Sequence, residues 1–207
     1  MNLVLPVGKI LGVVGESGSG KTTLAKILAG LLRPTGGQVY LNDHSLYSRN
    51  RSTDADARKA IRFIFQNVDA PLNPRIRIYN ILDEPLTVHT RLGKDGRQRR
   101  IEEVAAEVEL SSVLFDKYPW QLSGGEKRRV SIARALMWRP SFIIADEPSA
   151  GLDADLCEGF IALFRKLAEV ERIGVLVVSH ETLMLKALCD EVVELRDGSV
   201  GPIDLDE

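Results

Sequence analysis

The chain has 207 residues, of which 44% are apolar and 27% charged, and its formal net charge at pH 7 is -2. This length fits one globular domain, the near-neutral charge gives no general reason to expect a nucleic-acid partner, and no apolar run approaches the roughly 20 residues of a membrane span. The first residues lack the pattern of a signal peptide, and Cys157 and Cys189 lack metal-ligand spacing, so we expect buried, reduced thiols in the cytoplasm.

A glycine-rich stretch follows the apolar run at residues 10–14 and precedes a segment with helical spacing. Strand, glycine-rich loop and helix in this order are typical of a phosphate-binding P-loop. The glycines let backbone N–H groups point at phosphate oxygens, and the helix N-terminus adds partial positive charge. We expect Lys21 to reach the β- and γ-phosphates and the Thr22 hydroxyl to bind Mg²⁺. The predicted nucleotide-binding residues are Gly15, Glu16, Ser17, Gly18, Ser19, Gly20, Lys21, Thr22 and Thr23.

The pattern turns helical in the middle of the chain. Short strands are predicted at 38–42 and 61–65, and the second ends at Gln66, just before a loop rich in Pro and Asn. Beyond that loop Ile101, Val104, Ala105 and Val108 share one helical face. A basic cluster precedes this helix, and because acidic residues accompany it we interpret it as a salt-bridged face rather than a nucleic-acid patch. The cluster consists of Arg91, Lys94, Arg97, Arg99 and Arg100.

From residue 141 onward, strands and helices alternate again. We predict strands at 142–145 and 175–178, helices at 154–170 and 182–189, and a hairpin at 191–200. Alternating strands and helices indicate an α/β fold with a mainly parallel sheet flanked by helices, here that of a P-loop NTPase. We expect a single domain with its α/β core at residues 1–66 and 141–207, and an inserted α-helical subdomain at 67–140.

Two carboxylates close the apolar strand at 142–145. Asp146, at the carboxyl end of a buried strand, is placed to bind Mg²⁺, and Glu147 is placed to accept a proton from the water that attacks the γ-phosphate. The same three letters occur earlier at Asp83-Glu84-Pro85, but their lead-in is too short and polar for a central strand. We interpret that copy as the surface of a helical segment.

The stretch Leu122-Ser123-Gly124-Gly125-Glu126 stands before a helix predicted at 127–137. Exposed N–H groups at a helix start, together with a serine hydroxyl, form a second anion site. The same pattern also fits an ordinary helix start, with Ser123 as N-cap and Glu126 completing a capping box.

Taken in chain order, these motifs resemble the ATP-binding cassette ATPases, the motor subunits of ABC transporters. The stretch 15–22 resembles the Walker A loop, Gln66 the Q-loop glutamine and 122–126 the signature motif. The strand 142–146 resembles Walker B with Glu147 as catalytic glutamate, 149–153 the D-loop, and His180 the switch histidine.

The resemblance implies a mechanism in which two cassettes with RecA-like cores close head to tail around two ATP molecules. The Walker A loop of one cassette then faces Ser123, Gly124 and Gly125 of the other, with Asp153 in the D-loop as a further nucleotide contact. The implied catalytic residues are Glu147, His180, Lys21 and Gln66. The implied ligands of Mg²⁺ are Thr22, Gln66 and Asp146.

Within the family, Phe65-Gln66, Leu72 to Arg75 and Glu84-Pro85-Leu86 resemble the peptide and nickel importer branch. That branch implies an ATPase at the cytoplasmic face of the membrane that powers solute import with ATP and Mg²⁺. Its partners would be a second ATPase subunit, identical or different, integral membrane permease subunits, and indirectly an extracytoplasmic solute-binding protein. No nucleic acid is expected.

Two features depart from the family pattern. No aromatic residue for adenine stacking precedes Gly15, and the usual leading strands are missing. We expect either a truncated N-terminal β region, or adenine that is held less tightly or by another chain. We interpret Trp120, next to the signature-like stretch, as a packing residue. A soluble cassette ATPase acting on nucleic acid or ribosomes is the alternative function. A P-loop kinase or GTPase is disfavoured, because it leaves the signature-like stretch and His180 without a role.

Overall fold

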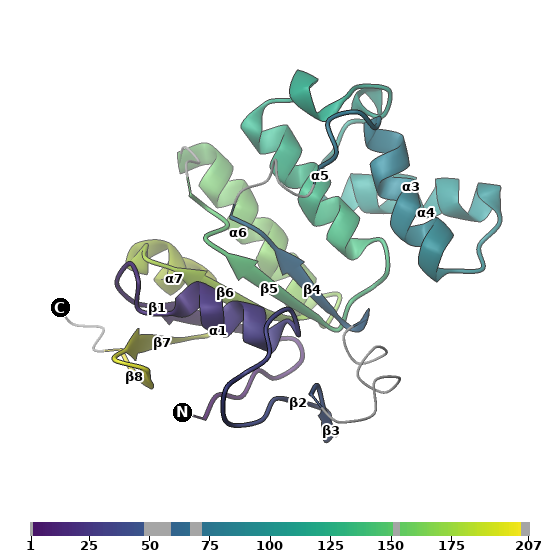
Figure 1. Ribbon diagram of the computed structural model, residues 1–207. Helices are drawn as coiled ribbons and strands as arrows, with labels where there is room; N and C mark the ends of the chain where they lie inside the picture. The colour runs from purple at the N-terminus through teal and green to yellow at the C-terminus, as the bar shows by residue number, and fades with distance from the viewer. Residues whose placement is uncertain (1, 48–58, 67–71, 151–153, 204–207) are drawn as a thin grey trace.

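The computed structural model describes residues 2–47, 59–66, 72–150 and 154–203. Its main sheet has six strands in the order β4-β5-β6-β1-β7-β8 (Figure 1). All neighbouring strands are parallel except β7 and β8, so the predicted mainly parallel α/β fold is confirmed. The strands are β1 (Ile10–Val14), β4 (Ile61–Ile64), β5 (Phe142–Asp146), β6 (Gly174–Ser179), β7 (Glu191–Arg196) and β8 (Ser199–Pro202). A separate hairpin pairs β2 (Tyr40–Leu41) with β3 (His44–Ser45).

Helices cover both faces of the sheet. Helix α1 (Lys21–Leu28) packs on one face, while α6 (Ala154–Glu169) and α7 (Thr182–Leu188) pack on the other. Between β4 and β5 the described chain forms α3 (Ile78–His89), α4 (Lys94–Glu107), η1 (Ser112–Leu114), η2 (Pro119–Gln121) and α5 (Gly124–Leu136). Figure 1 shows α3, α4 and α5 grouped together beyond the β4 edge of the sheet.

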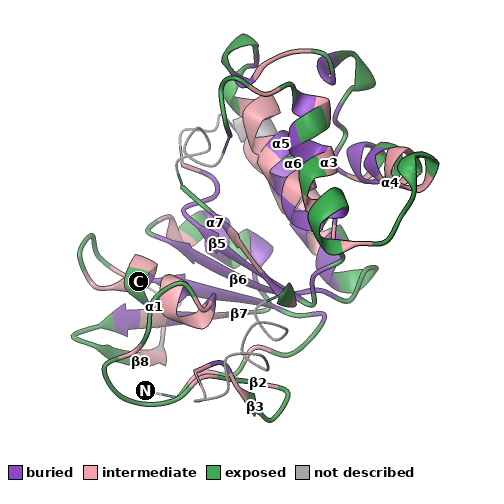
Figure 2. Ribbon diagram, turned by 45° about the vertical axis from the view of Figure 1, so that its right-hand side comes forward, coloured by how far each residue is buried: buried purple, intermediate pink, exposed green. Residues whose placement is uncertain are grey.

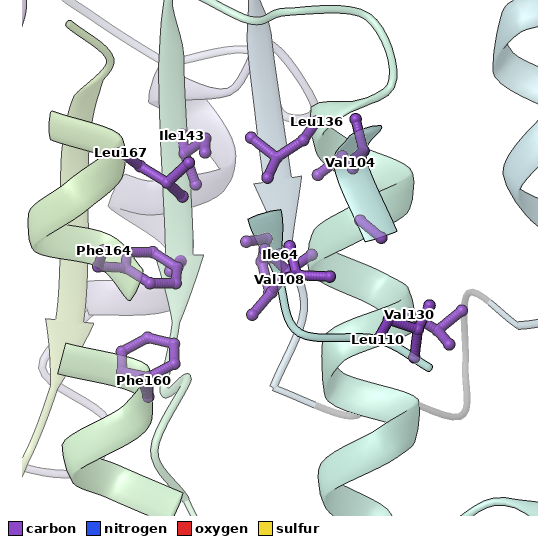
Figure 3. Packing of buried hydrophobic residues seen from close by; sticks show 14 of the residues in the cluster. Ile64, Val104, Val108, Leu110, Val130, Leu136, Ile143, Phe160, Phe164 and Leu167 are labelled. Atoms are coloured by element: carbon purple, nitrogen blue, oxygen red, sulfur yellow. The ribbon is translucent and has the colours of Figure 1, made fainter. Parts of the chain in front are cut away.

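The central strands β1, β5 and β6 are buried along their whole length because both of their faces are covered (Figure 2). In β5, Ile143 and Ala145 pack in the cluster that contains Phe160, Phe164 and Leu167 of α6 (Figure 3). Phe142 and Ile144 point the other way, into the cluster under α1. This core fixes the carboxyl ends of β1, β5 and β6 beside one another, and these ends carry the candidate site.

Several local predictions are confirmed. Asp83 and Glu84 lie within α3, where they pair with Arg97 (2.7 Å) and Arg134 (3.0 Å). The Asp-Glu-Pro at 83–85 therefore lies on the surface of a helix, as predicted. Within the basic cluster, Arg97 and Arg100 both contact carboxylates, as expected for a salt-bridged face. β7 and β8 form the predicted hairpin, and Asp197 and Gly198 at its turn both have positive φ.

Three expectations need correction. Helix α5 begins at Gly124 rather than at residue 127, because Ser123 caps it directly. Trp120 is not a packing residue, since 68% of it is exposed. Cys157 is only half-buried, whereas Cys189 is buried as expected. Within the described ranges, no helix combines the length and apolar character that a membrane crossing needs.

Candidate nucleotide-hydrolysis site

The glycine-rich loop connects the end of β1 to the start of α1. Gly18 and Gly20 adopt positive φ values of 85° and 100°, a region that side chains rarely tolerate. A Cβ on Gly15 would lie 2.6 Å from the backbone oxygen of Leu195, so only glycine fits between β1 and β7 there. Within the described part of the chain, no side chain caps the start of α1, which leaves its first N–H groups and its positive dipole end available to an anion.

Lys21 lies folded over this loop. Its ammonium donates to the backbone oxygens of Gly15 (2.7 Å) and Glu16 (2.9 Å), and the residue is buried. The hydroxyl of Ser19 is buried and has no hydrogen-bond partner among the described residues. A buried cation and an unsatisfied polar atom in one glycine loop fit a phosphate group.

Thr22 and Asp146 bring two oxygen donors together. The Thr22 hydroxyl donates to Asp146 Oδ1 at 3.0 Å, which joins the start of α1 to the end of β5. Asp146 is buried, and this burial raises the pKa of its carboxyl group although Thr22 donates to it. A hydroxyl beside a carboxylate is a ligand pair that suits Mg²⁺, so these residues fit the expected metal. Gln66 is exposed and lies two residues beyond the end of β4, the strand next to β5.

Glu147 follows directly and is held from two sides. Its backbone N–H donates to the Val178 oxygen (2.9 Å), and its φ of 48° is unusual for a residue with a side chain. Glu147 Oε1 lies 2.9 Å from His180 Nδ1, and Oε2 accepts a hydrogen bond from the Ser179 hydroxyl at 2.9 Å. The hydrogen bond with Glu147 raises the pKa of His180. The structure thus brings together two residues that are far apart in the sequence.

The signature-like stretch forms the start of α5. Ser123 Oγ accepts a hydrogen bond from the Glu126 N–H (3.3 Å), and the Ser123 N–H donates to Glu126 Oε2 (2.7 Å), so the two residues form a capping box. Ser123 and Gly124 are exposed, and no hydrogen bond in the described structure joins them to the glycine loop of the same chain. Asp153, the other predicted nucleotide contact, lies outside the described residues.

Two residues of the site's hydrogen-bond network were not among the predicted site residues. Ser179 is fully buried against Glu147, and Ser149 donates to Glu181 Oε2 at 3.2 Å beside it. The available signal was the position of Ser179, a polar residue at the end of an apolar strand. Strand ends in a parallel sheet gather at one edge.

The sequence model of the ABC transporter family matches residues 1–150, and the chain belongs to this family. Among curated relatives, the dipeptide transport ATP-binding protein DppF of Haemophilus influenzae is 37% identical over 191 residues, which cover 92% of this chain and 58% of DppF. The putrescine export system ATP-binding protein SapF of Escherichia coli is 39% identical over 200 residues, covering 97% and 74%.

Solved structures of ABC transporter cassettes also match this chain. The dimeric structure of the ABC transporter cassette MJ0796 matches with a TM-score of 0.86 and 32% identity, covering 97% of this chain and 86% of that one. A second structure of MJ0796, in a post-hydrolysis state with ADP and Pi, matches equally well. The chain therefore shares its cassette fold with proteins that dimerise and hold nucleotide, and it spans 58% of the length of DppF.

Proposed function

We propose that this chain is the ATP-hydrolysing subunit of a membrane transport system. The observation that carries the proposal is the meeting of the Thr22–Asp146 pair and the Glu147–His180 pair at the end of the glycine loop. A phosphate cradle, a metal-binding pair and a carboxylate base are the parts that hydrolysis of a nucleoside triphosphate requires. Membership of the ABC transporter family supports ATP as the nucleotide.

In this proposal each residue has a separate task. Lys21 transfers its ammonium contacts from the loop oxygens of Gly15 and Glu16 to the phosphates of ATP. Thr22 and Asp146 hold Mg²⁺, which when bound neutralises charge on the phosphate oxygens. Glu147 orients the attacking water and accepts its proton, a role that contributes about 10²- to 10⁴-fold to rates. His180 positions Glu147 and the γ-phosphate, and Gln66 senses whether the γ-phosphate or Mg²⁺ is bound.

We propose that the site is completed by a second ATPase subunit. Among the described residues, no hydrogen bond joins Ser123, Gly124 or Gly125 to the glycine loop of their own chain, and the matching MJ0796 structure is dimeric. In a head-to-tail pair, the exposed start of α5 with its N–H groups would meet the ATP on the partner subunit. Asp153 would contact the same nucleotide.

A groove beside β4 is the proposed docking surface for an integral membrane permease. It has a volume of about 480 Å³ and lies between β4 and the helices α3 and α5. Phe65 (40% exposed) and Val88 (66% exposed) line it, and Arg62 lies 4.7 Å from the ring centre of Trp138 inside it. Its position next to Gln66 would link permease movement to the nucleotide. The cytoplasmic face of the membrane follows as the proposed location.

The two curated relatives are named for dipeptide transport and for putrescine export. We propose peptide import of the peptide/nickel type for this chain, with the solute chosen by the permease and an extracytoplasmic solute-binding protein.

The test of the proposed function is turnover of Mg-ATP by the unmutated chain, by Lys21→Ala and by Glu147→Gln. We expect both variants to lose turnover, Lys21→Ala through lost nucleotide binding and Glu147→Gln with binding retained. Equal turnover by Glu147→Gln and the unmutated chain would refute the role of Glu147. Failure of the unmutated chain to bind Mg-ATP would refute the proposal for the chain alone.

A further inference from the structure

Ser179 lies beside the proposed catalytic base because of the sheet register. β5 and β6 are parallel neighbours, and Asp146 pairs with Val178, so Glu147 just beyond β5 lies beside Ser179 at the end of β6. The Glu147 N–H donates to the Val178 oxygen and extends this pairing beyond the strand. Ser179 has no exposed surface, and its hydroxyl therefore exchanges no hydrogen bonds with bulk water.

The hydroxyl of Ser179 has its single proton directed at Glu147. Its oxygen accepts the backbone N–H of Glu181 at 3.1 Å, and its proton is donated to Glu147 Oε2 at 2.9 Å. A serine hydroxyl has only one proton, so this arrangement leaves it no other donor contact. Glu181 is itself held by the Ser149 hydroxyl, which donates to Glu181 Oε2. The donor thus belongs to a connected network rather than to a freely rotating side chain.

The two contacts of the Glu147 carboxylate differ in how firmly they hold it. His180 contacts Oε1, but 61% of its side chain is exposed and its charge varies with pH. Ser179 contacts Oε2 from a fully buried position, and its hydroxyl does not titrate in the working range. A hydrogen bond to a charged group in a buried place is among the stronger kinds.

We infer that Ser179 is a positioning residue for ATP hydrolysis: it fixes Oε2 of Glu147 and so orients the carboxylate toward the attacking water. This inference rests on the proposed role of Glu147 as base. Ser179 touches neither nucleotide nor water in this scheme, so its loss affects the chemical step and leaves nucleotide binding by the glycine loop in place.

The experiment compares Ser179→Thr with Ser179→Val, because these two side chains have the same shape and differ only in the hydroxyl. At saturating Mg-ATP we expect kcat of Ser179→Val to lie about tenfold to hundredfold below that of Ser179→Thr, the range for a hydrogen bond to a charged group. The KM for ATP should be nearly equal in the two variants. Ser179→Ala, which adds no volume, gives the same comparison against the unmutated chain if the larger side chains disturb folding.

A second measurement separates positioning from a general structural effect. In the Glu147→Gln background the base is absent, so exchanging Thr for Val at position 179 should leave the residual turnover unchanged. Equal kcat for the Thr and Val variants, or the same ratio in the Glu147→Gln background, would overturn the inference while the proposed function stands. An unmutated chain that binds Mg-ATP without turnover would instead overturn the proposed function itself.

Discussion

The charge of His180 depends on its contact with Glu147. The hydrogen bond at 2.9 Å raises the pKa of His180 above its ordinary value of 6.5, whereas burial, and then the charges of Arg62 and Lys59, lower the pKa of His89. An NMR titration of the nucleotide-free chain should therefore show His180 titrating above 6.5 and His89 below it. Glu147→Gln should bring His180 down toward 6.5 and leave His89 where it was.

The same contact sets the direction of a pH effect on stability. Because the pKa of His180 is higher in the folded chain, the ion pair with Glu147 stabilises the fold fully below about pH 6.5 and stops doing so as pH rises through the folded pKa. The effect is small, since the imidazole is largely exposed. A His180 titration that does not respond to Glu147→Gln would show that the carboxylate does not hold the imidazole.

The start of α5 combines a structural task with a proposed binding task, and one substitution separates them. Ser123→Ala removes the N-cap, and we expect it to lower the free energy of unfolding by about 1 kcal/mol in a urea titration. Ser123→Asp keeps an N-cap and should stay close to the unmutated stability, but it places a negative charge where the partner's phosphate would bind. It should therefore abolish ATP-driven dimerisation.

The capping box has its own pH signature. The Ser123 N–H lowers the pKa of Glu126 below its ordinary value of 4.5, with smaller contributions from the Ser123 side chain and Lys117 against a burial effect that raises it. A lowered carboxyl pKa means that the box stabilises the fold above about pH 4.5 and loses this effect as pH falls through the folded pKa. The stability difference between the unmutated chain and Glu126→Gln, whose amide does not titrate, should therefore shrink in acid. A difference that stays constant down to pH 3 would contradict the capping box.

The elements of the core were predictable because each is specified by a short local pattern. β5 and β6 are apolar runs that end in one polar residue each, Asp146 and Ser179, and α1 follows a glycine loop whose spacing is itself a motif. Contacts between elements were harder to predict from the sequence, because they depend on which strands are neighbours. That Ser179 would face Glu147 follows only from β6 lying next to β5, an order that the sequence does not state.

Features of the molecular surface were even harder to predict from the sequence. The apolar character of Trp120 favours packing, yet it is exposed and stacks on Tyr118, at 6.2 Å between ring centres. Hydrophobic character predicts burial poorly for a single residue on a short segment such as η2. The groove beside β4 combines residues from β4, α3 and α5, so it has no continuous signature in the sequence.

At the scale of the whole molecule, the sheet order gathers segments that are distant in the chain at one edge, whereas α5 belongs to the helical group beyond β4 (Figure 1). The groove lies where these two parts meet, so its docking role can be tested apart from hydrolysis. Val88→Asp, on the exposed side of α3, should leave the turnover of the isolated chain unchanged. It should weaken co-purification with a permease subunit that the unmutated chain binds. Unchanged co-purification would contradict the proposed docking surface.

The proposed dimer makes the sharpest prediction at this scale. Glu147→Gln keeps the size of the carboxylate, and its amide oxygen can still accept the Ser179 hydroxyl, so ATP should bind normally. Because the base is lost, the nucleotide stays intact and the closed pair should accumulate. Light scattering at saturating Mg-ATP should then report a mass twice that of the nucleotide-free chain.

The matched control is Glu147→Gln combined with Ser123→Asp. Its glycine loop is unchanged, so it should bind one ATP per chain, yet remain a monomer because the added carboxylate repels the phosphates across the interface. If Glu147→Gln binds Mg-ATP and stays monomeric, a site completed by Ser123 and Gly125 of a second copy is ruled out. The subunit that completes the site would then have to be a different cassette. To test this, candidate partner subunits are added to the Glu147→Gln variant, and the same light-scattering measurement reports whether a larger complex forms.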